Sequence, residues 1–309
     1  MSGRWKGKRV AVLYGGRSSE REVSLESGRG CAEALRSLGY DVALVDVDLE
    51  VAARLRAIEA EVAFIALHGR FGEDGCIQGL LESMGIPYTC SGVLASSVGM
   101  DKVFSKGLFR TFGLKVVDYV VVPPGRVPTL SVADLPFGLP CVVKPSCEGS
   151  SVGVHLVREA GALRAACEDA ARYKGDVIVE RYVKGKEIQV AVLDGRALGA
   201  IEIVFDGEFY DYEAKYHSSA TQFFYPARIP EAHMHRVLEA SEIAHRGLGC
   251  SGVTRTDFIV TQDGTPYVLE TNTLPGMTSH SLVPKIAAGN GISFAELCER
   301  LLETAALQA

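Results

Sequence analysis

The 309-residue sequence has no hydrophobic run long enough to span a membrane. Near the amino terminus, a basic start precedes an apolar run at 10–14 that is too short for the core of a signal peptide. The net charge is −6, and no cluster of Lys or Arg indicates a nucleic-acid surface or a polybasic membrane anchor. These absences predict a cytoplasmic protein with neither a nucleic-acid nor a membrane partner.

Several familiar signatures are also missing. The eight cysteines form no C-x-x-C pair and no metal-binding spacing with His, so we expect reduced, mostly structural thiols. The loop GGRSSE follows a strand but lacks G-x-G-x-x-G, and no G-x-x-x-x-G-K-[ST] loop occurs. A nicotinamide dehydrogenase is therefore disfavoured, and any nucleotide site must be built in another way.

The first third of the chain alternates strand-like and helix-like segments. We expect strands at Arg9–Tyr14, 42–47 and 62–67, with a helix over 24–38. This alternation is typical of a parallel α/β sheet. The loops GGRSSE and HGRFGEDG follow its outer strands and carry Glu20 and His68 at the strands' carboxyl ends, where ligands of such sheets generally bind.

The remaining two thirds predict α+β units. The sequence indicates helices over 101–112, 160–173 and 231–248, strands at 116–122, 141–144, 154–157, 177–183, 187–193 and 197–204, a polar loop at 210–225, and a last helix from Phe294. The length of the chain favours two or three subdomains. We predict divisions into residues 1–98, 99–185 and 186–309.

The most informative pattern is an Asp-Gly turn, Asp263-Gly264, between the strand-like runs TRTDFIVTQ and TPYVLETNT. A two-residue hairpin turn there would place Asp257 opposite Glu270 and Arg255 opposite Asn272 on one face of the sheet. Carboxylates directly opposite each other repel unless a positive charge lies between them. Asp257, Glu270 and Asn272 are oxygen ligands, so the pattern predicts a hard cation such as Mg²⁺.

A second candidate site surrounds the turn Glu148–Gly153. Backbone N–H groups and hydroxyls of such a glycine-rich turn can bind phosphate oxygens. Lys144 precedes the turn at the end of an apolar strand, where a buried ammonium needs an anionic partner. The long loop that contains Lys215 and Tyr216 is typical of an active-site lid, although a solvated surface loop would look the same.

Four motifs, HGRFGEDG, KPSCEGSSVG, YDYEAKY and ETNTLPGMTSHSLVP, occur in this order. Together with GGRSSEREVS near the start, they resemble the D-alanine:D-alanine ligases of the ATP-grasp superfamily, and the resemblance covers nearly the whole chain. It implies an ATP-grasp fold preceded by a parallel-sheet (preATP-grasp) domain. Two α+β units would hold ATP, and the amino acids would bind where all three parts meet.

The resemblance also implies roles for individual residues. Those implied to bind ATP are Lys102, Lys144, Glu180, Tyr182, Val183 and Glu187. Those implied to bind two Mg²⁺ or Mn²⁺ ions are Asp257, Glu270 and Asn272. Those implied to bind or activate the two D-alanines are Glu20, His68, Ser150, Lys215, Tyr216, Arg255, Gly276, Ser281 and Leu282.

The implied reaction transfers the γ-phosphoryl group of ATP to one D-alanine, and the amine of the second attacks the resulting acyl phosphate. The product, D-alanyl-D-alanine, is a peptidoglycan precursor, and the family implies a homodimer. Cys90 stands where many relatives carry glycine, which removes none of these groups. D-alanine:D-lactate and D-alanine:D-serine ligases share the same core and are the alternatives, although Tyr216 in the lid favours the dipeptide. Another ATP-grasp ligase of a carboxylate and an amine is the broader alternative.

Overall fold

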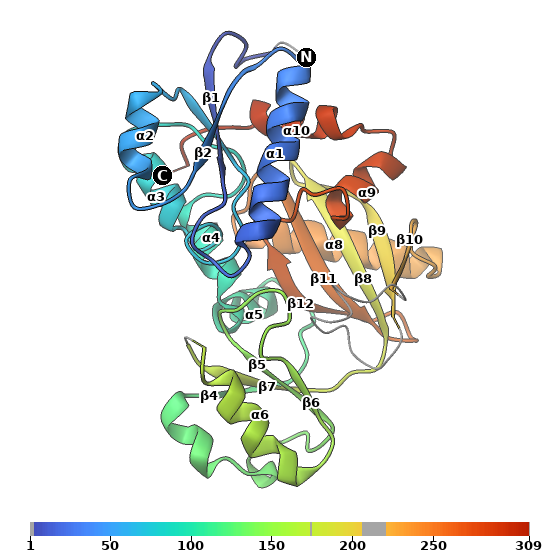
Figure 1. Cartoon of the computed structure of the whole chain (residues 1–309). Helices are drawn as coiled ribbons and strands as arrows, with labels where there is room; N and C mark the ends of the chain where they lie inside the picture. The colour runs from blue at the N-terminus through green and yellow to red at the C-terminus, as the bar shows by residue number, and fades with distance from the viewer. Residues whose placement is uncertain (1–2, 174, 206–220, 309) are drawn as a thin grey trace.

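The computed structural model describes residues 3–173, 175–205 and 221–308. Its strands form three separate sheets that follow one another along the chain, each with helices packed on it (Figure 1).

The first sheet is parallel, with strand order β2-β1-β3. Its strands are β1 (Arg9–Tyr14), β2 (Asp41–Asp46) and β3 (Val62–Ile65), and its helices are α1 (Arg21–Ser37), α2 (Val51–Ala57) and α3 (Cys76–Met84). All residues of β3 and four of the six residues of β1 are buried, as expected for a parallel sheet covered on both faces. Helix α1 packs on β1 and also on α10 (Phe294–Glu303), so residues from both ends of the chain share this core.

The second sheet has the order β4-β7-β5-β6, and every neighbouring pair is antiparallel. Its strands are β4 (Tyr119–Val122), β5 (Cys141–Pro145), β6 (His155–Val157) and β7 (Val177–Arg181), covered by α6 (Leu163–Ala170). The chain reaches it through α4 (Val93–Met100) and α5 (Lys102–Thr111). The proline-rich segment between β4 and β5 contains two short 3-10 helices, Pro124–Thr129 and Val132–Asp134.

The third sheet is antiparallel, with the order β10-β9-β8-β11-β12. Its strands are β8 (Lys186–Leu193), β9 (Arg196–Val204), β10 (Gln222–Phe224), β11 (Val253–Val260) and β12 (Pro266–Asn272). Because side chains alternate along a strand, Ile188 and Val190 face α8 (Glu231–Gly247), whereas Ala191 and Leu193 join the core that contains α9 (Leu282–Gly289). Helices therefore cover both faces.

The predicted order of α/β followed by α+β is confirmed. Most predicted segments match within a few residues, but the helix predicted over 160–173 is shorter, because Ala160–Ala162 is a 3-10 turn and α6 ends at Ala170. The sequence did not predict α2, α3, α4 or α9, and strand β10 lies within the segment 210–225 that was predicted as a polar loop. All eight cysteines are free thiols. The divisions after residues 98 and 185 stay predictions.

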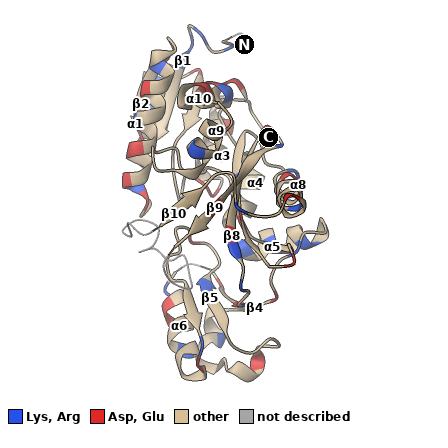
Figure 2. Cartoon of the chain, turned by 90° about the vertical axis from the view of Figure 1, so that its right-hand side faces the viewer, with Lys and Arg blue, Asp and Glu red and all other residues tan. Residues whose placement is uncertain are grey.

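Charged residues of both signs are interspersed over the molecule in Figure 2, and neither sign gathers on one face in that view. No helix in residues 3–173, 175–205 and 221–308 is both long and apolar enough to cross a membrane.

Candidate active site

The hairpin of β11 and β12 has the register that the sequence predicted, although its turn differs. Arg255 pairs with Asn272 and Asp257 with Glu270. The two-residue turn is wrong: Thr261 and Thr265 close a three-residue loop, in which Gly264 has a φ of +78°. A β-bulge beside Asp257 then restores the predicted pairing, because Phe258 pairs with Val268 and leaves one residue of β12 unmatched.

Both carboxylates of the hairpin are held by cations of the chain itself. Asp257 accepts two hydrogen bonds from Arg255, at 2.8 and 2.9 Å, and one from the Gln189 amide at 3.1 Å. The Lys102 ammonium lies 2.9 Å from Glu270 Oε2. The repulsion on which the metal prediction rested is therefore relieved in part by Lys102 and Arg255, without requiring a bound cation.

The donor set nevertheless fits a hard cation. Glu270 and Asn272 alternate along β12 opposite Asp257 and Arg255, so carboxylate and amide oxygens share one face of the sheet. Asn272 Oδ1 also accepts a hydrogen bond from Leu274 N at 3.1 Å. Within the described residues, no group of three or more His, Cys, Asp or Glu could hold a metal, so a site here depends on two carboxylates and the amide.

A second charged cluster contains Lys144, Glu180 and Lys106. The Glu180 carboxylate lies between the two ammonium groups, at 2.9 Å from Lys106 and 2.9 Å from Lys144. The ammonium at the end of the apolar strand thus has its anionic partner within the chain, and its predicted contact with a phosphate stays a prediction. Lys106 is completely buried and was not predicted. Its spacing of four residues from Lys102 puts both lysines on one face of α5, which is the signal that could have revealed it.

Burial and ion pairing shift the pKa values of Lys102, Lys106 and Glu180 in opposite directions. Burial lowers the pKa of Lys106 to about 8, although Glu180 favours its charged form. Burial favours neutral Glu180, but the two lysines prevail and hold the pKa of its carboxyl below the ordinary value. Burial likewise opposes the charge of Lys102, yet Glu270 raises its pKa overall. The cluster therefore places two lysine side chains, Lys106 and Lys144, around the single carboxylate of Glu180.

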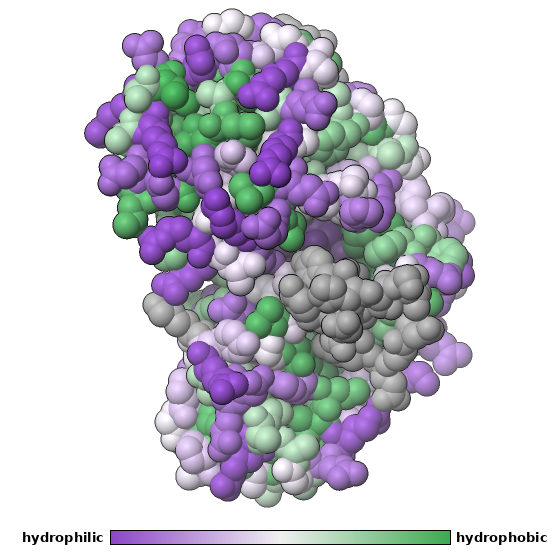
Figure 3. All heavy atoms as spheres, in the orientation of Figure 1, coloured by the Kyte–Doolittle hydropathy of each residue, from purple (hydrophilic) through white to green (hydrophobic). Residues whose placement is uncertain are grey.

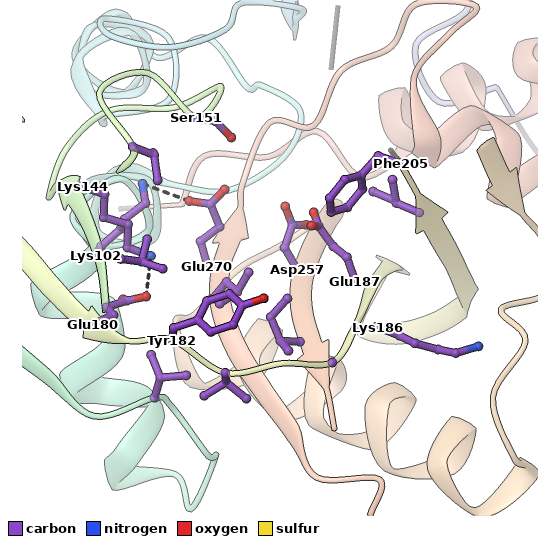
Figure 4. Close-up of a pocket in the computed structure, with 18 of the residues that line it drawn as sticks. Lys102, Lys144, Ser151, Glu180, Tyr182, Lys186, Glu187, Phe205, Asp257 and Glu270 are labelled. Atoms are coloured by element: carbon purple, nitrogen blue, oxygen red, sulfur yellow. Dashed lines mark ion pairs between the residues drawn. The ribbon is translucent and has the colours of Figure 1, made fainter. Parts of the chain in front are cut away.

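A cavity of about 310 Å³ lies between the second and third sheets. Figure 4 shows Lys102, Lys144 and Glu180 on one side and Glu187, Asp257 and Glu270 on strands of the third sheet. Tyr182 and Val183, in the segment that joins β7 to β8, also line it. The predicted ATP-binding residues are thus brought together in one place, with apolar walls from Val142, Ile259 and Leu269.

A larger cavity of about 510 Å³ adjoins the first sheet. Glu20 precedes α1 and receives a hydrogen bond from Ser150 of the glycine-rich turn. His68 follows β3; its Nδ1 contacts the Leu274 carbonyl at 3.2 Å and its Nε2 contacts Ser27 Oγ at 3.0 Å. Contacts from three distant parts of the sequence therefore meet at this cavity.

Another wall of the larger cavity comes from the segment before α9. Ser281 is the N-cap residue of α9, and its hydroxyl accepts a hydrogen bond from Thr278 N at 3.0 Å. Gly276 packs so closely that a Cβ atom there would lie 2.7 Å from Ser281 Oγ. Gly276, Ser281 and Leu282 all line the cavity together with Arg255 and Asn272. Lys215 and Tyr216 lie outside the described residues.

The two cavities share walls formed by Lys102, Glu148, Gly149 and Glu270. A phosphate held beside Lys102 would therefore lie next to a ligand of the larger cavity. In the space-filling view, hydrophilic and hydrophobic residues are interspersed over this face of the molecule (Figure 3).

Comparison with known proteins identifies this arrangement. The family model described as "D-ala D-ala ligase C-terminus" matches residues 108–303, and "D-ala D-ala ligase N-terminus" matches residues 50–91. The chain belongs to the D-alanine–D-alanine ligase family. The resemblance drawn from the motifs is confirmed, and with it the ATP-grasp fold.

Relatives of this ligase family match over nearly the whole chain. A D-alanine–D-alanine ligase of Anaeromyxobacter sp. (strain K) is 71% identical over 305 residues, covering 99% of each chain. One from Geotalea uraniireducens is 53% identical, covering 98% of this chain and 97% of that protein.

Solved structures of ligases agree with this fold. A Bacillus anthracis D-alanine–D-alanine ligase is 38% identical with a TM-score of 0.86, covering 96% of this chain and 97% of that one. The same ligase complexed with ATP is 35% identical with a TM-score of 0.84, covering 96% of this chain and 97% of that one. The VanG D-Ala:D-Ser ligase of Enterococcus faecalis is 30% identical with a TM-score of 0.86, covering 96% of this chain and 99% of that one.

Proposed function

We propose that this ligase joins two D-alanine molecules to D-alanyl-D-alanine, for peptidoglycan synthesis, with conversion of ATP to ADP and phosphate. The observation that carries the proposal is the wall of Lys102, Glu148, Gly149 and Glu270 that the two cavities share. A nucleotide in the smaller cavity could deliver its terminal phosphoryl group across that wall to a carboxylate in the larger one.

In this proposal, the smaller cavity holds ATP. Lys102 and Lys144 line this cavity, and their ammonium groups suit contacts with the phosphates. Glu180 and Glu187, with the backbone of Tyr182 and Val183, would hold the adenine and the ribose. The apolar walls favour a flat base over a bare triphosphate.

We further propose that Asp257, Glu270 and Asn272 bind two Mg²⁺ ions, with Mn²⁺ as a substitute. Such ions would neutralise the charge that develops on the transferring phosphoryl group. Lys102 and Arg255 hold the carboxylates in place and would release part of their hydrogen bonding when a cation arrives.

The larger cavity would hold both amino acids. Glu20 would bind the ammonium of the first D-alanine, and Ser150, which already contacts Glu20, would join it to the lid residue Tyr216. Lys215, Ser281 and Leu282 would receive the second D-alanine, with His68 nearby.

In the second step, the neutral amine of the second D-alanine would attack the acyl phosphate and form a tetrahedral oxyanion. Arg255 and the backbone N–H of Gly276 are the groups we propose to stabilise that charge. The loss of phosphate would complete the peptide bond. A site closed to water would protect the acyl phosphate until the amine arrives.

The proposal is tested by measuring phosphate release from ATP and Mg²⁺, with the product mass determined in parallel. We expect release that requires D-alanine, fails with L-alanine and yields the dipeptide. Release that does not depend on D-alanine would contradict the proposal.

A second candidate function is the joining of D-alanine to D-serine. It is favoured by the similarity to VanG, whose TM-score of 0.86 equals that of the Bacillus anthracis ligase. D-lactate is the other alternative acceptor, because the groups proposed for phosphoryl transfer do not distinguish it from an amino acid. Adding D-serine or D-lactate to the D-alanine assay and comparing product masses separates these alternatives, and another ATP-grasp ligase would yield none of these products.

The proposed setting is the cytoplasm, where ATP is available, and the proposed assembly is the homodimer expected of the family. Light scattering coupled to size-exclusion chromatography measures the assembly directly, and a mass of 33.1 kDa would indicate a monomer.

A further inference from the structure

The larger cavity contains a lysine that no role described above uses. Lys285 lies in the first turn of α9 and lines the cavity together with Ser281 and Leu282. Its Nζ donates a hydrogen bond to the His280 carbonyl at 2.7 Å and lies 4.3 Å from the centre of the Phe223 ring.

Among the described residues, the other two Lys or Arg side chains that line this cavity are already paired with carboxylates. Lys102 forms an ion pair with Glu270 at 2.9 Å, and Arg255 forms one with Asp257 at 2.8 Å. Lys285 has only a neutral carbonyl and an aromatic ring as its recorded partners, and it pairs with no carboxylate of the described residues. Burial also lowers the pKa of Lys285.

The position of Lys285 strengthens its attraction for an anion. The N-cap residue Ser281 makes no side-chain capping bond to α9, and the positive end of the helix dipole faces the same region. Pro284 lacks an N–H group, so the first turn attracts an anion through the N–H groups of its other residues and the Lys285 ammonium.

A second, independent observation indicates that the cavity is built for a ligand. Gln189 on β8 is 2% exposed and lines the cavity. Its Nε2 donates to Asp257, which fixes the orientation of the amide, and its Oε1 is buried without a hydrogen-bond partner in the described part of the chain. Such an acceptor is costly until a donor arrives, and the N–H group of an amino acid is one such donor.

Gln189 and Lys285 lie on the same side of the third sheet. Gln189 pairs with Ile201 of β9, and Ile203 of β9 pairs with Phe223, the ring under Lys285. Side chains at these paired and alternating positions share one face, so the unsatisfied acceptor and the unmatched cation border the same space. A small zwitterion offers both an N–H donor and a carboxylate.

We propose that Lys285 binds the carboxylate of the incoming amino acid and selects acceptors that carry one. This inference rests on the proposed function and adds a specificity-determining residue to it. The interaction is made by a side chain, so substitution can remove it, whereas contacts with backbone N–H groups would remain.

The test is a competition between D-alanine and D-alaninamide as acceptors. D-alaninamide has the same amine but no carboxylate, and it cannot replace the donor because it has no carboxyl group to phosphorylate. With ATP and Mg²⁺, mass spectrometry gives the ratio of dipeptide to dipeptide amide. We expect Lys285→Met and Lys285→Gln to lower this ratio about tenfold or more, as for the loss of one charge-assisted hydrogen bond.

Two control variants distinguish a loss of selectivity for the acceptor carboxylate from a general loss of folding or activity. Lys285→Arg keeps the charge and should retain most of the wild-type ratio. Lys8→Met makes the same change at a surface lysine paired with Glu61, and it should leave the ratio unchanged. An unchanged ratio in both Lys285→Met and Lys285→Gln, with wild-type enzyme making dipeptide, would overturn this inference alone. No dipeptide from the wild-type enzyme would overturn the proposed function as well.

Discussion

In the buried cluster of Lys106, Lys144 and Glu180, one carboxylate forms ion pairs with two lysines. Glu180 is the only carboxylate recorded within ion-pair distance of either lysine among the described residues. Removing its charge leaves two buried ammonium groups near each other without an anion, whereas removing Lys106 leaves the pair of Lys144 and Glu180 intact. The cost of unmatched buried charge therefore depends on which partner is lost.

We expect Glu180→Gln to lower the free energy of unfolding by about 3–5 kcal/mol, the range typical of breaking a buried ion pair. Lys106→Met should cost distinctly less. Urea unfolding at pH 7 measures both. The double variant should recover part of the loss of Glu180→Gln, because it removes one unmatched ammonium; equal losses in the two single variants would contradict this account.

At the scale of residues, Lys144 was predicted from the sequence and Lys106 was not. The conflict between a charge and an apolar strand pointed to Lys144 and its need for an anionic partner. Lys106 lies in a helix of mixed composition, where a lysine usually faces solvent, and only its spacing of four residues from Lys102 indicated that the two share a face of α5. The burial of Lys106 follows from the packing of α5 against β12, α4 and α8.

At the scale of elements, α5 carries both Lys102 and Lys106, and its start is fixed by Asp101. The Asp101 side chain accepts hydrogen bonds from Val103 N at 2.8 Å and Phe104 N at 3.3 Å. Such an N-cap contributes about 1 kcal/mol. Because Lys102 follows the cap directly, fraying of this first turn would move an ammonium that we place at the phosphates.

We expect Asp101→Ala to lower stability by about 1 kcal/mol and to raise the KM for ATP several-fold. Steady-state kinetics and urea unfolding test this pair of effects. Ser293→Ala is the matched control, because Ser293 caps α10 through Glu296 N at 3.2 Å away from both cavities. It should cost similar stability without changing the KM for ATP; equal changes in KM would refute the link to Lys102.

For the hairpin of β11 and β12, the sequence predicted the strand pairing but not the length of the turn. Alternation and the Asp-Gly turn predicted the pairing of Arg255 with Asn272 and of Asp257 with Glu270. The loop is one residue longer than predicted, and the β-bulge beside Asp257 compensates for the extra residue. The pairing of Asp257 with Glu270 is therefore as predicted, although the turn is not. Helix α9 was missed because it contains Pro284, which is tolerated in the first turn of a helix.

At the scale of the whole molecule, the smaller cavity is lined by both antiparallel sheets. Lys144 and Glu180 come from the second, whereas Glu187, Asp257 and Glu270 come from the third. A nucleotide bound there would connect the two sheets, and its binding free energy would add to that of folding.

We expect a non-hydrolysable ATP analogue with Mg²⁺ to raise the melting temperature, with about 2.7 kcal/mol of stabilisation at a hundredfold excess over its Kd. Without Mg²⁺ the shift should be smaller, because Asp257 and Glu270 would repel the phosphates. Differential scanning calorimetry measures both conditions. Glu270→Gln should reduce the part that depends on Mg²⁺, and identical shifts with and without the ion would argue against a metal at this hairpin.

The sharing of one core by α1 and α10 has a consequence for synthesis of the chain. Strand β1 is made early, but its core is completed by Leu297, Leu301 and Leu302, almost 300 residues later. The second sheet, with α6, draws its core from residues 122–179, and we expect it to fold once these residues have left the ribosome. The middle of the protein can therefore be native while its beginning still exposes apolar surface, so a chaperone that acts on the nascent chain would be needed at the beginning, not in the middle.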